Sequence, residues 1–112
     1  MKSNKYIEFG YNSKGYYVKN KNKAIDTVIA YLKKLKAKPA KYFDENGVLI
    51  DIKFNIKGNN YAIYINNSYM YNKNNKSIQD RAFLESIGYK VIYLSYKDIN
   101  SWRFRDIIIN SL

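Results

Sequence analysis

The sequence contains no cysteine and no histidine, and only one proline among its 112 residues. Without cysteine, disulfides, iron–sulfur clusters, thiolate zinc sites and cysteine nucleophiles are excluded. Without histidine, serine–histidine triads and histidine acid–base catalysis are excluded, as is nearly every zinc or non-haem iron centre. What remains for catalysis is nine acidic residues, lysines, tyrosines and hydroxyls, and the site these best support is a carboxylate site holding Mg²⁺.

Long apolar runs are also absent. No segment approaches the roughly 20 apolar residues that span a bilayer. The start, MKSNKYIEFGY, is basic but has no apolar stretch after it, so we do not expect a signal peptide. The absence of cysteine gives no sign of an oxidising compartment. We therefore expect a cytoplasmic protein of one domain, residues 1–112, with no membrane partner.

Lysine is what the sequence has in excess. Lys and Arg number 20 against 9 acidic residues, which gives a net charge of +11. The segment up to Lys41 holds 11 of these bases and 2 of these acids, so its net charge alone is +9. Such a charge predicts a polyanion or an acidic protein surface as partner. A genome rich in A and T would also enrich lysine, so lysines that serve only solubility are the alternative.

Apolar spacing and turn residues predict the order β-β-α-β-β-β-α-β-α. The expected elements are a hairpin over 5–19, a helix over 24–37, three strands within 41–66, a helix over 77–87, a strand over 89–96 and a helix over 98–112. Strands in a run followed by helix, strand and helix predict an α/β (α+β) domain with a mixed sheet flanked by helices.

We expect the central sheet to include Leu49–Ile56, Tyr61–Asn66 and Lys90–Tyr96. Residues expected in the core, between this sheet and the two C-terminal helices, are Leu84, Ile87, Val91, Leu94, Ile107 and Ile108. At the helix ends, Ser77 is a candidate first cap, Gly88 a candidate stop, and Asp98 or Ser101 a candidate cap of the last helix.

The segment KFNIKGNNYAIYINNSYMY is followed by QDRAFLESIGYKVIYLSYKDI, in which an expected helix ends at Gly-Tyr and leads into a strand. Over Leu49–Ile99 this pattern resembles the PD-(D/E)xK nucleases of the very-short-patch-repair endonuclease type. RNA-binding RAP domains share a similar helix–strand ending. The resemblance implies a restriction-endonuclease-like fold.

The resemblance also places the acidic ligands of that family on residues that are not acidic here. The metal-binding Asp falls on Lys53, the catalytic Glu on Tyr64, the next Asp on Asn66 and a His on Met70. A lysine where Mg²⁺ should bind would repel the ion. On this alignment we expect a nuclease-like scaffold with no catalytic residue, no metal and no small-molecule cofactor.

A second alignment uses Asp44, Asp51 and Lys53, which read D…D-x-K. In an active Mg²⁺-dependent nuclease the two carboxylates would hold the metal and Lys53 would position a hydroxide. Asp51 and Lys53 are two residues apart, so we expect them to share one face of a strand. The same residues also suit an ordinary turn and an exposed pair, so both readings stay open.

Two groups of residues are candidates for partner binding. One is basic, with lysines that lead into the first expected helix or lie on its exposed face: Lys19, Lys21, Lys23, Lys33, Lys34 and Lys36. The other is the pair Tyr69 and Tyr71, which could stack on unpaired bases or anchor a protein interface. We expect Trp102 and Phe104 to lie in the core or at its edge.

These observations favour a non-catalytic, nuclease-fold binding protein. The role we expect is inhibition of a nucleic-acid-targeting defence nuclease, as with the anti-CRISPR and anti-restriction proteins of phages and mobile elements. A charge of +11 excludes a DNA mimic, so the partner is a host nuclease or its guide or target nucleic acid. The alternatives are a nucleic-acid-binding module without inhibition, the Mg²⁺-dependent nuclease of the second alignment, and an immunity protein to a toxin.

Overall fold

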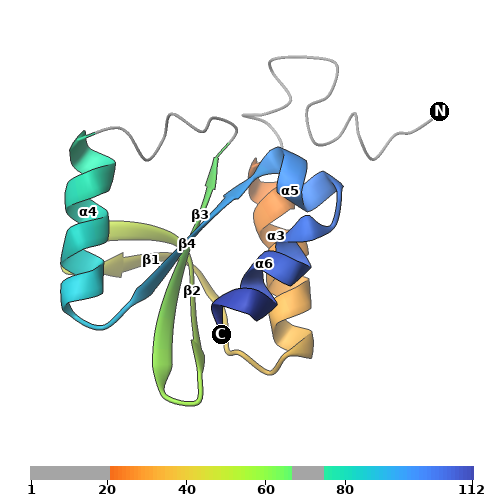
Figure 1. The fold of residues 1–112 in the computed structure, drawn as a ribbon, viewed down its shortest axis with the longest axis horizontal. Helices are drawn as coiled ribbons and strands as arrows, with labels where there is room; N and C mark the ends of the chain where they lie inside the picture. The colour runs from red at the N-terminus through yellow and green to blue at the C-terminus, as the bar shows by residue number, and fades with distance from the viewer. Residues whose placement is uncertain (1–20, 67–74) are drawn as a thin grey trace.

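A four-stranded sheet forms the centre of the fold, and helices cover both of its faces (Figure 1). The computed structural model describes residues 21–66 and 75–112. The strands are β1 (Ala40–Glu45), β2 (Val48–Ile56), β3 (Asn59–Asn66) and β4 (Lys90–Ser95). The helices are α3 (Lys21–Lys34), α4 (Asn75–Ser86), α5 (Tyr96–Asn100) and α6 (Arg103–Ser111). The predicted α+β domain with a mixed sheet is confirmed, whereas the expected hairpin 5–19 lies outside the described residues.

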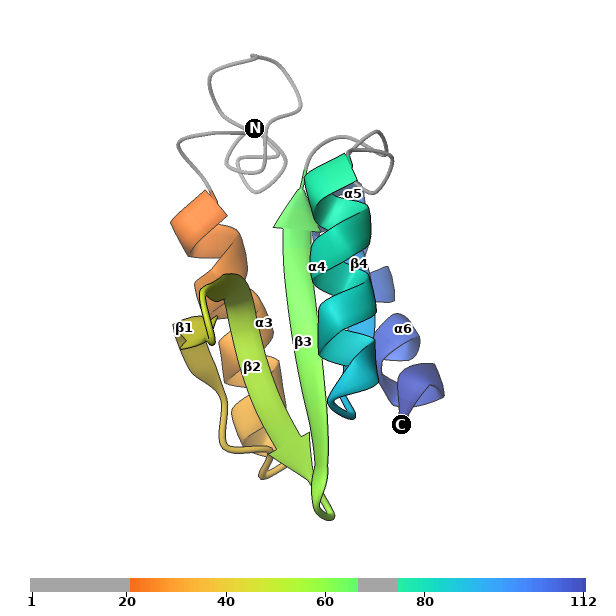
Figure 2. The same ribbon diagram turned by 90° about the vertical axis from the view of Figure 1, so that its left-hand side faces the viewer.

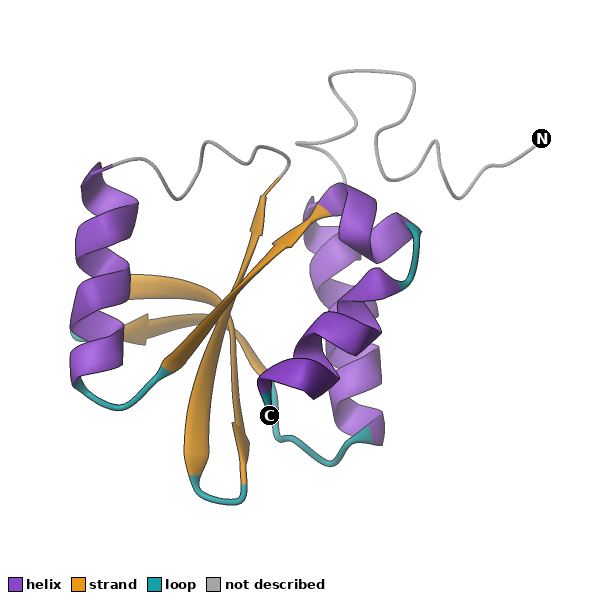
Figure 3. Ribbon diagram, viewed as in Figure 1, coloured by secondary structure: helices purple, strands orange, loops and turns teal. Residues whose placement is uncertain are grey.

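The strands follow one another across the sheet in sequence order. β1, β2 and β3 are antiparallel and are joined by two-residue turns, Asn46–Gly47 and Lys57–Gly58 (Figure 3). β3 and β4 are parallel neighbours, with Tyr61 opposite Lys90, and α4 lies in the connection between them. The three strands predicted for the central sheet are therefore confirmed.

The larger of two cores lies between the sheet and α3, α5 and α6. Phe54 and Tyr61 stack face to face with their ring centres 4.6 Å apart. Phe104 of α6 meets Tyr31 of α3 edge to face at 5.6 Å, which ties these two helices together. The buried residues of this core are Ala24, Ile25, Val28, Leu32, Ala37, Ile52, Phe54, Tyr61, Ile63, Ile65, Ile92, Leu94, Tyr96, Ile99, Phe104 and Ile108. Because a buried large apolar side chain contributes about 1.5–3 kcal/mol, this core supplies most of the stability.

A smaller core lies on the other face of the sheet, under α4. Its buried residues are Ile50, Ala62, Tyr64, Leu84 and Tyr89. Figure 2 looks onto α4, with the sheet behind it and α3 beyond the sheet. The prediction of a single core between the sheet and both C-terminal helices is therefore wrong, because α4 and α6 cover opposite faces.

The residues predicted to be buried divide between these cores. Leu84 is buried under α4, Leu94 and Ile108 are buried in the larger core, and Val91 and Ile107 are partly buried. Ile87 is 45% exposed, so its prediction is wrong. It lies in the turn after α4, beyond the last helical residue that packs on the sheet.

Helix α4 ends at Ser86, one residue before the predicted end, and Gly88 terminates it as predicted. The N–H of Gly88 donates to the carbonyl of Glu85 at 3.1 Å, and the N–H of Tyr89 donates to that of Leu84 at 3.0 Å. This is a Schellman motif, and it requires the positive φ of +101° that glycine adopts here. The start was predicted wrongly: Ser77 lies inside the helix, which begins at Asn75.

Helix α3 lies three residues earlier than predicted, over Lys21–Lys34. It ends in the same motif, with N–H groups of Lys36 and Ala37 donating to carbonyls of Lys33 and Leu32 at 3.0 and 3.1 Å. Lys36 takes the left-handed position, with φ +61°. The prediction that Lys36 lies on the helix face is therefore wrong, because it follows the helix.

The predicted final helix, 98–112, is two helices. Ser95 caps α5: the N–H of Asp98 donates to its hydroxyl at 3.0 Å, and its own N–H donates to the Asp98 carboxylate at 2.9 Å. Neither Asp98 nor Ser101 begins the last helix, because the chain turns at Trp102, where φ is +65°. Phe104 is buried in the core, and Trp102, 43% exposed, packs against it at the edge of the core, as predicted.

None of the helices within the described ranges is long and apolar enough to cross a membrane.

Candidate functional site

Lys53, the position aligned with a nuclease metal ligand, lies on the α4 side of the sheet. Its ammonium is 4.2 Å from the centre of the Phe43 ring and 5.9 Å from that of Tyr89. A lysine held over aromatic faces gains roughly 0.5–2 kcal/mol from the ring quadrupoles. Lys53 thus contributes a partly buried cation to the packing of the smaller core.

The other aligned positions are near Lys53 or outside the described residues. Tyr64 is buried in the smaller core, and its hydroxyl donates to the Leu49 carbonyl at 2.9 Å. Asn66 is the last residue of β3, where side-chain alternation places it on the same face as Tyr64. Met70 lies outside the described residues. The fold therefore gathers Lys53, Tyr64 and Asn66 on one face of the sheet.

The Asp51 carboxylate is only 6% exposed and has two described partners. One oxygen accepts the N–H of Ile65 at 2.9 Å, and the other lies 3.2 Å from the ammonium of Lys21 in α3. A buried carboxylate needs such compensation because desolvation of its charge is costly. Asp51 is thereby engaged in joining β2, β3 and the first turn of α3.

Asp51 also marks a change in the direction of the side chains of β2. Ile50 packs under α4 and Ile52 packs in the larger core, although residues two apart in a regular strand share a face. The backbone pairing of β2 with β3 stops at Ile52, so the carboxylate supplies the acceptor that Ile65 would otherwise find in the strand. The prediction that Asp51 and Lys53 share a face is wrong for this reason, since Lys53 lies under α4.

Asp44 is engaged in the first hairpin. Its carboxylate accepts the N–H of Gly47 at 2.7 Å, which stabilises the turn. Asp44, Asp51 and Lys53 therefore have separate partners and do not converge. Within the described residues, no three carboxylates gather in an arrangement that could hold a metal ion.

Two buried tyrosines have perturbed hydroxyls. Burial raises the pKa of Tyr96 to about 12, and the nearby negative charge of Asp51 adds to the rise. Burial likewise raises the pKa of Tyr89, helped by a 2.6 Å hydrogen bond that its hydroxyl donates to Glu45. Both tyrosines therefore stay protonated at neutral pH, and the Tyr89 hydroxyl donates to Glu45 in the packing of the sheet.

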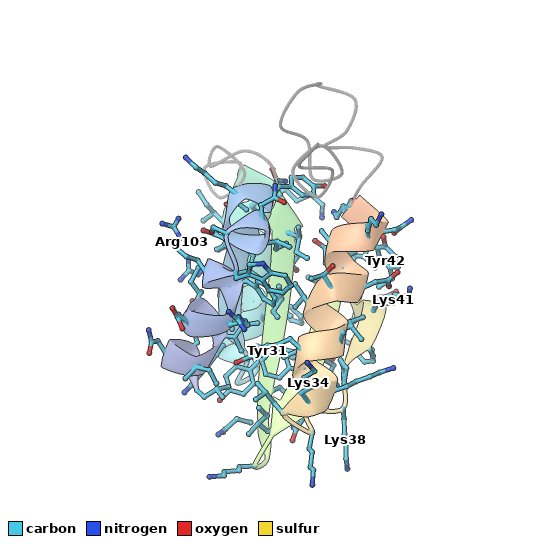
Figure 4. The ribbon with its side chains drawn as sticks, turned by 90° about the vertical axis from the view of Figure 1, so that its right-hand side faces the viewer. Tyr31, Lys34, Lys38, Lys41, Tyr42 and Arg103 are labelled. Carbon is cyan, nitrogen blue, oxygen red and sulfur yellow. The ribbon has the colours of Figure 1, made fainter. Side chains whose placement is uncertain are left out.

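Among the described residues, a group of exposed lysines lies at one end of the fold, which we call the basic end. It consists of Lys33, Lys34, Lys36, Lys38 and Lys57. The N–H of Asn55 donates to the Ala37 carbonyl at 3.2 Å, so the loop after α3 lies beside the end of β2 that leads to Lys57. Figure 4 shows Lys34 and Lys38 at the lower end of the molecule.

The basic end comes from two stretches of the sequence that contain no acidic residue. The sequence has no Asp or Glu between Asp26 and Asp44, and none between Asp51 and Asp80. None of the five lysines forms an ion pair with a described residue. By contrast, Lys41, next along the chain, is paired with Asp26 at 3.1 Å.

The lysines predicted for partner binding divide into three groups. Lys33, Lys34 and Lys36 are exposed at the basic end, and Lys23 is exposed near the start of α3. Lys21 is paired with Asp51, so it helps hold the fold together. Lys19, Tyr69 and Tyr71 lie outside the described residues.

Three lysines of the basic end have backbone conformations that favour glycine or asparagine. The φ angles of Lys36, Lys38 and Lys57 are +61°, +40° and +53°. A side chain with a Cβ costs roughly 1–2 kcal/mol in the left-handed region. Positive φ in residues of this kind is uncommon, and such strain gathers at functional sites.

Sequence reasoning missed Lys38 and Lys57. The signal for Lys57 was present, because Lys57–Gly58 stands where a hairpin turn is expected and turn residues project into solvent. No signal in the sequence reveals that Lys57 lies close to the loop after α3, since that contact joins segments distant in the chain.

No family model matches the chain, and no match to it is found among curated proteins or solved structures.

Proposed function

We propose that this protein acts by binding and not by catalysis, and that the basic end holds the phosphate backbone of a nucleic acid. By this binding, the protein would cover the guide or target nucleic acid of a defence nuclease and so inhibit the nuclease. The fold it would use is a nuclease-like scaffold whose ligand positions hold Lys53, Tyr64 and Asn66.

The observation that carries the proposal is the group of five exposed lysines, none of which forms an ion pair with a described residue. Lysine is a flexible point charge that suits phosphate better than base edges, so the proposed binding has little sequence specificity. Five neighbouring cations without internal ion pairs repel one another, and a polyanion relieves that repulsion. The left-handed backbone of Lys36, Lys38 and Lys57 adds support, because folding alone favours other residues there.

Charge reversal at the basic end tests the proposal. We expect the purified protein to bind labelled oligonucleotides, with log affinity falling steeply against log salt. Lys34/Lys57→Glu should lower affinity at least about tenfold near 0.1 M salt and reduce the salt slope by roughly two units. The matched control is Lys76/Lys97→Glu, which makes the same charge change at the start of α4 and in α5.

Equal losses in the two variants would mean that only net charge matters, and the basic end would have no special role. Failure of the wild-type protein to bind any oligonucleotide would overturn the proposal. For the inhibitory role, bound oligonucleotide should be protected from an added non-specific nuclease, and excess oligonucleotide should remove the protection. Protection that excess oligonucleotide does not relieve would mean that the nuclease itself is the partner.

A further inference from the structure

Trp102 occupies an unusual position for a tryptophan. It follows α5 in the left-handed conformation, with φ +65°, where a helix end usually has glycine. Its side chain is 43% exposed, although tryptophan carries the largest apolar surface of any residue. A large ring thus lies partly in solvent at a strained backbone position.

The ring is nevertheless held in a defined place. Trp102 packs against Phe104 with ring centres 5.6 Å apart, and the buried Phe104 meets Tyr31 of α3 at 5.6 Å. The three rings form a continuous series from α3 to the surface beside α6. A ring supported from behind in this way loses little freedom when it stacks on a ligand.

Arginine lies beside this ring. The guanidinium of Arg105 is 5.2 Å from the centre of the Trp102 ring, and Arg103 is also exposed, paired with Asp98 at 3.0 Å. Figure 4 shows Arg103 beside α6 and Lys34 and Lys38 beside α3, with Tyr31 between the two helices. The series of rings thus leads from Trp102 and Arg105 through Phe104 to Tyr31, three residues before Lys34 of the basic end.

We propose that Trp102 and Arg105 form a stacking site for an unpaired base, so that the partner is single-stranded nucleic acid. Aromatic rings and arginine planes stack on the face of any unpaired base. In a duplex, the neighbouring base pairs already cover the faces of each base. The stacking site holds one base while the basic end neutralises the phosphates of the same strand. This inference rests on the proposed function, because it names the kind of nucleic acid that the basic end binds.

Trp102 is the only tryptophan of the chain, so its fluorescence reports the proposed contact directly. Titration of the wild-type protein with a single-stranded oligonucleotide should quench the emission, and the same sequence as a blunt duplex should quench it much less. This measurement needs no variant, so it does not depend on how a substitution affects folding.

Variants then separate stacking from charge. Trp102→Gly removes the ring and suits the left-handed backbone, so relief of strain should offset part of the packing on Phe104 that is lost. By anisotropy, it should bind single strands about tenfold or more weakly, with duplex affinity unchanged. Trp102→Phe keeps an aromatic face and should recover most of the affinity. Arg105→Gln, which leaves the ring in place, should weaken single-strand binding by a smaller factor.

The outcomes distinguish this inference from the proposed function. If the wild-type protein binds no nucleic acid, both are overturned. If it binds single strands and duplexes equally, without quenching, and Trp102→Gly changes nothing while Lys34/Lys57→Glu weakens binding, the stacking site is overturned and the basic end stands. Preferential single-strand binding that Trp102→Gly abolishes supports the stacking site.

Discussion

The two β-turns of the meander share the same geometry, and their two-residue loops, Asn46–Gly47 and Lys57–Gly58, differ only in the first residue. In the first, Asp44 accepts the N–H of Gly47 at 2.7 Å, and in the second Asn55 accepts that of Gly58 at 3.2 Å. Both loops contain two residues with positive φ, the pattern of a type I′ turn. The first residue of the loop is Asn46, with φ +52°, in one turn and Lys57, with φ +53°, in the other.

The ends of α3 and α4 show the same contrast. Each closes with a Schellman motif, but the left-handed residue is Gly88 in α4 and Lys36 in α3. Asparagine and glycine are the residues that folding favours at such positions. The first turn and the end of α4 have these residues, whereas the matching turn and helix end at the basic end have lysine. The local requirements of the fold therefore do not explain why Lys36 and Lys57 occupy these positions.

The largest expected effect comes from giving the turn and helix end of the basic end the residues found in the first turn and at the end of α4. Lys36→Gly combined with Lys57→Asn should raise the free energy of unfolding by about 1–2 kcal/mol, because both substitutions relieve left-handed strain. The same variant should bind nucleic acid more weakly and show a salt slope reduced by roughly two units. Urea unfolding and salt-dependent anisotropy measure the two effects. Undiminished binding by the stabilised protein would show that these lysines have no binding role.

The reverse exchange should destabilise α4. At Gly88 an added Cβ meets no atom within 4 Å, so the cost of Gly88→Lys is conformational and not steric. Because φ is +101° there, we expect a loss of about 1–2 kcal/mol in the free energy of unfolding. Gly88→Ala is the control, since it adds the Cβ without the charge. A loss much larger for Lys than for Ala would point to electrostatics instead.

The smallest effect should appear in the first turn. Asn46→Lys gives its two-residue loop the sequence Lys-Gly of the second turn and should cost a few tenths to about 1 kcal/mol. The factor by which this variant gains nucleic-acid affinity should be smaller than the factor lost when Lys57 is removed. Asn46 is next to Glu45 and near Asp44, and these acids offset the added charge. Thermal unfolding and anisotropy check both statements. A gain as large as the Lys57 loss would mean that the position of the charge does not matter.

Much of the fold could be predicted because its signals are local. Alternating apolar residues and the Asn-Gly and Gly-Asn-Asn turns identified the central strands, and Gly88 identified the end of α4. The start of α3 was missed because Lys21 and Lys23 are unfavourable at a helix N-terminus. Asp51, thirty residues away, partners Lys21 there, and no sequence pattern reveals that pairing.

The remaining errors have a similar cause. A helix that stops at tryptophan gives no signal, since the usual marker of a left-handed end is glycine or asparagine, and so the break at Trp102 was not predicted. Lys53 and Asp51 were placed on one face because alternation assumes a regular strand. The hydrogen bond from Ile65 to the Asp51 carboxylate is a contact between strands, and it is part of what makes β2 irregular.

The connection between β3 and β4 has a consequence for the order of folding. Both antiparallel ladders close through two-residue turns, whereas the parallel ladder places Asn66 opposite Ser95, and Tyr61 opposite Lys90, across the whole α4 connection. Closing so long a loop loses chain entropy before any contact compensates for it, while a hairpin forms within about 1–10 μs. We therefore expect the three-stranded meander to form early and the docking of β4 onto β3 to set the folding rate.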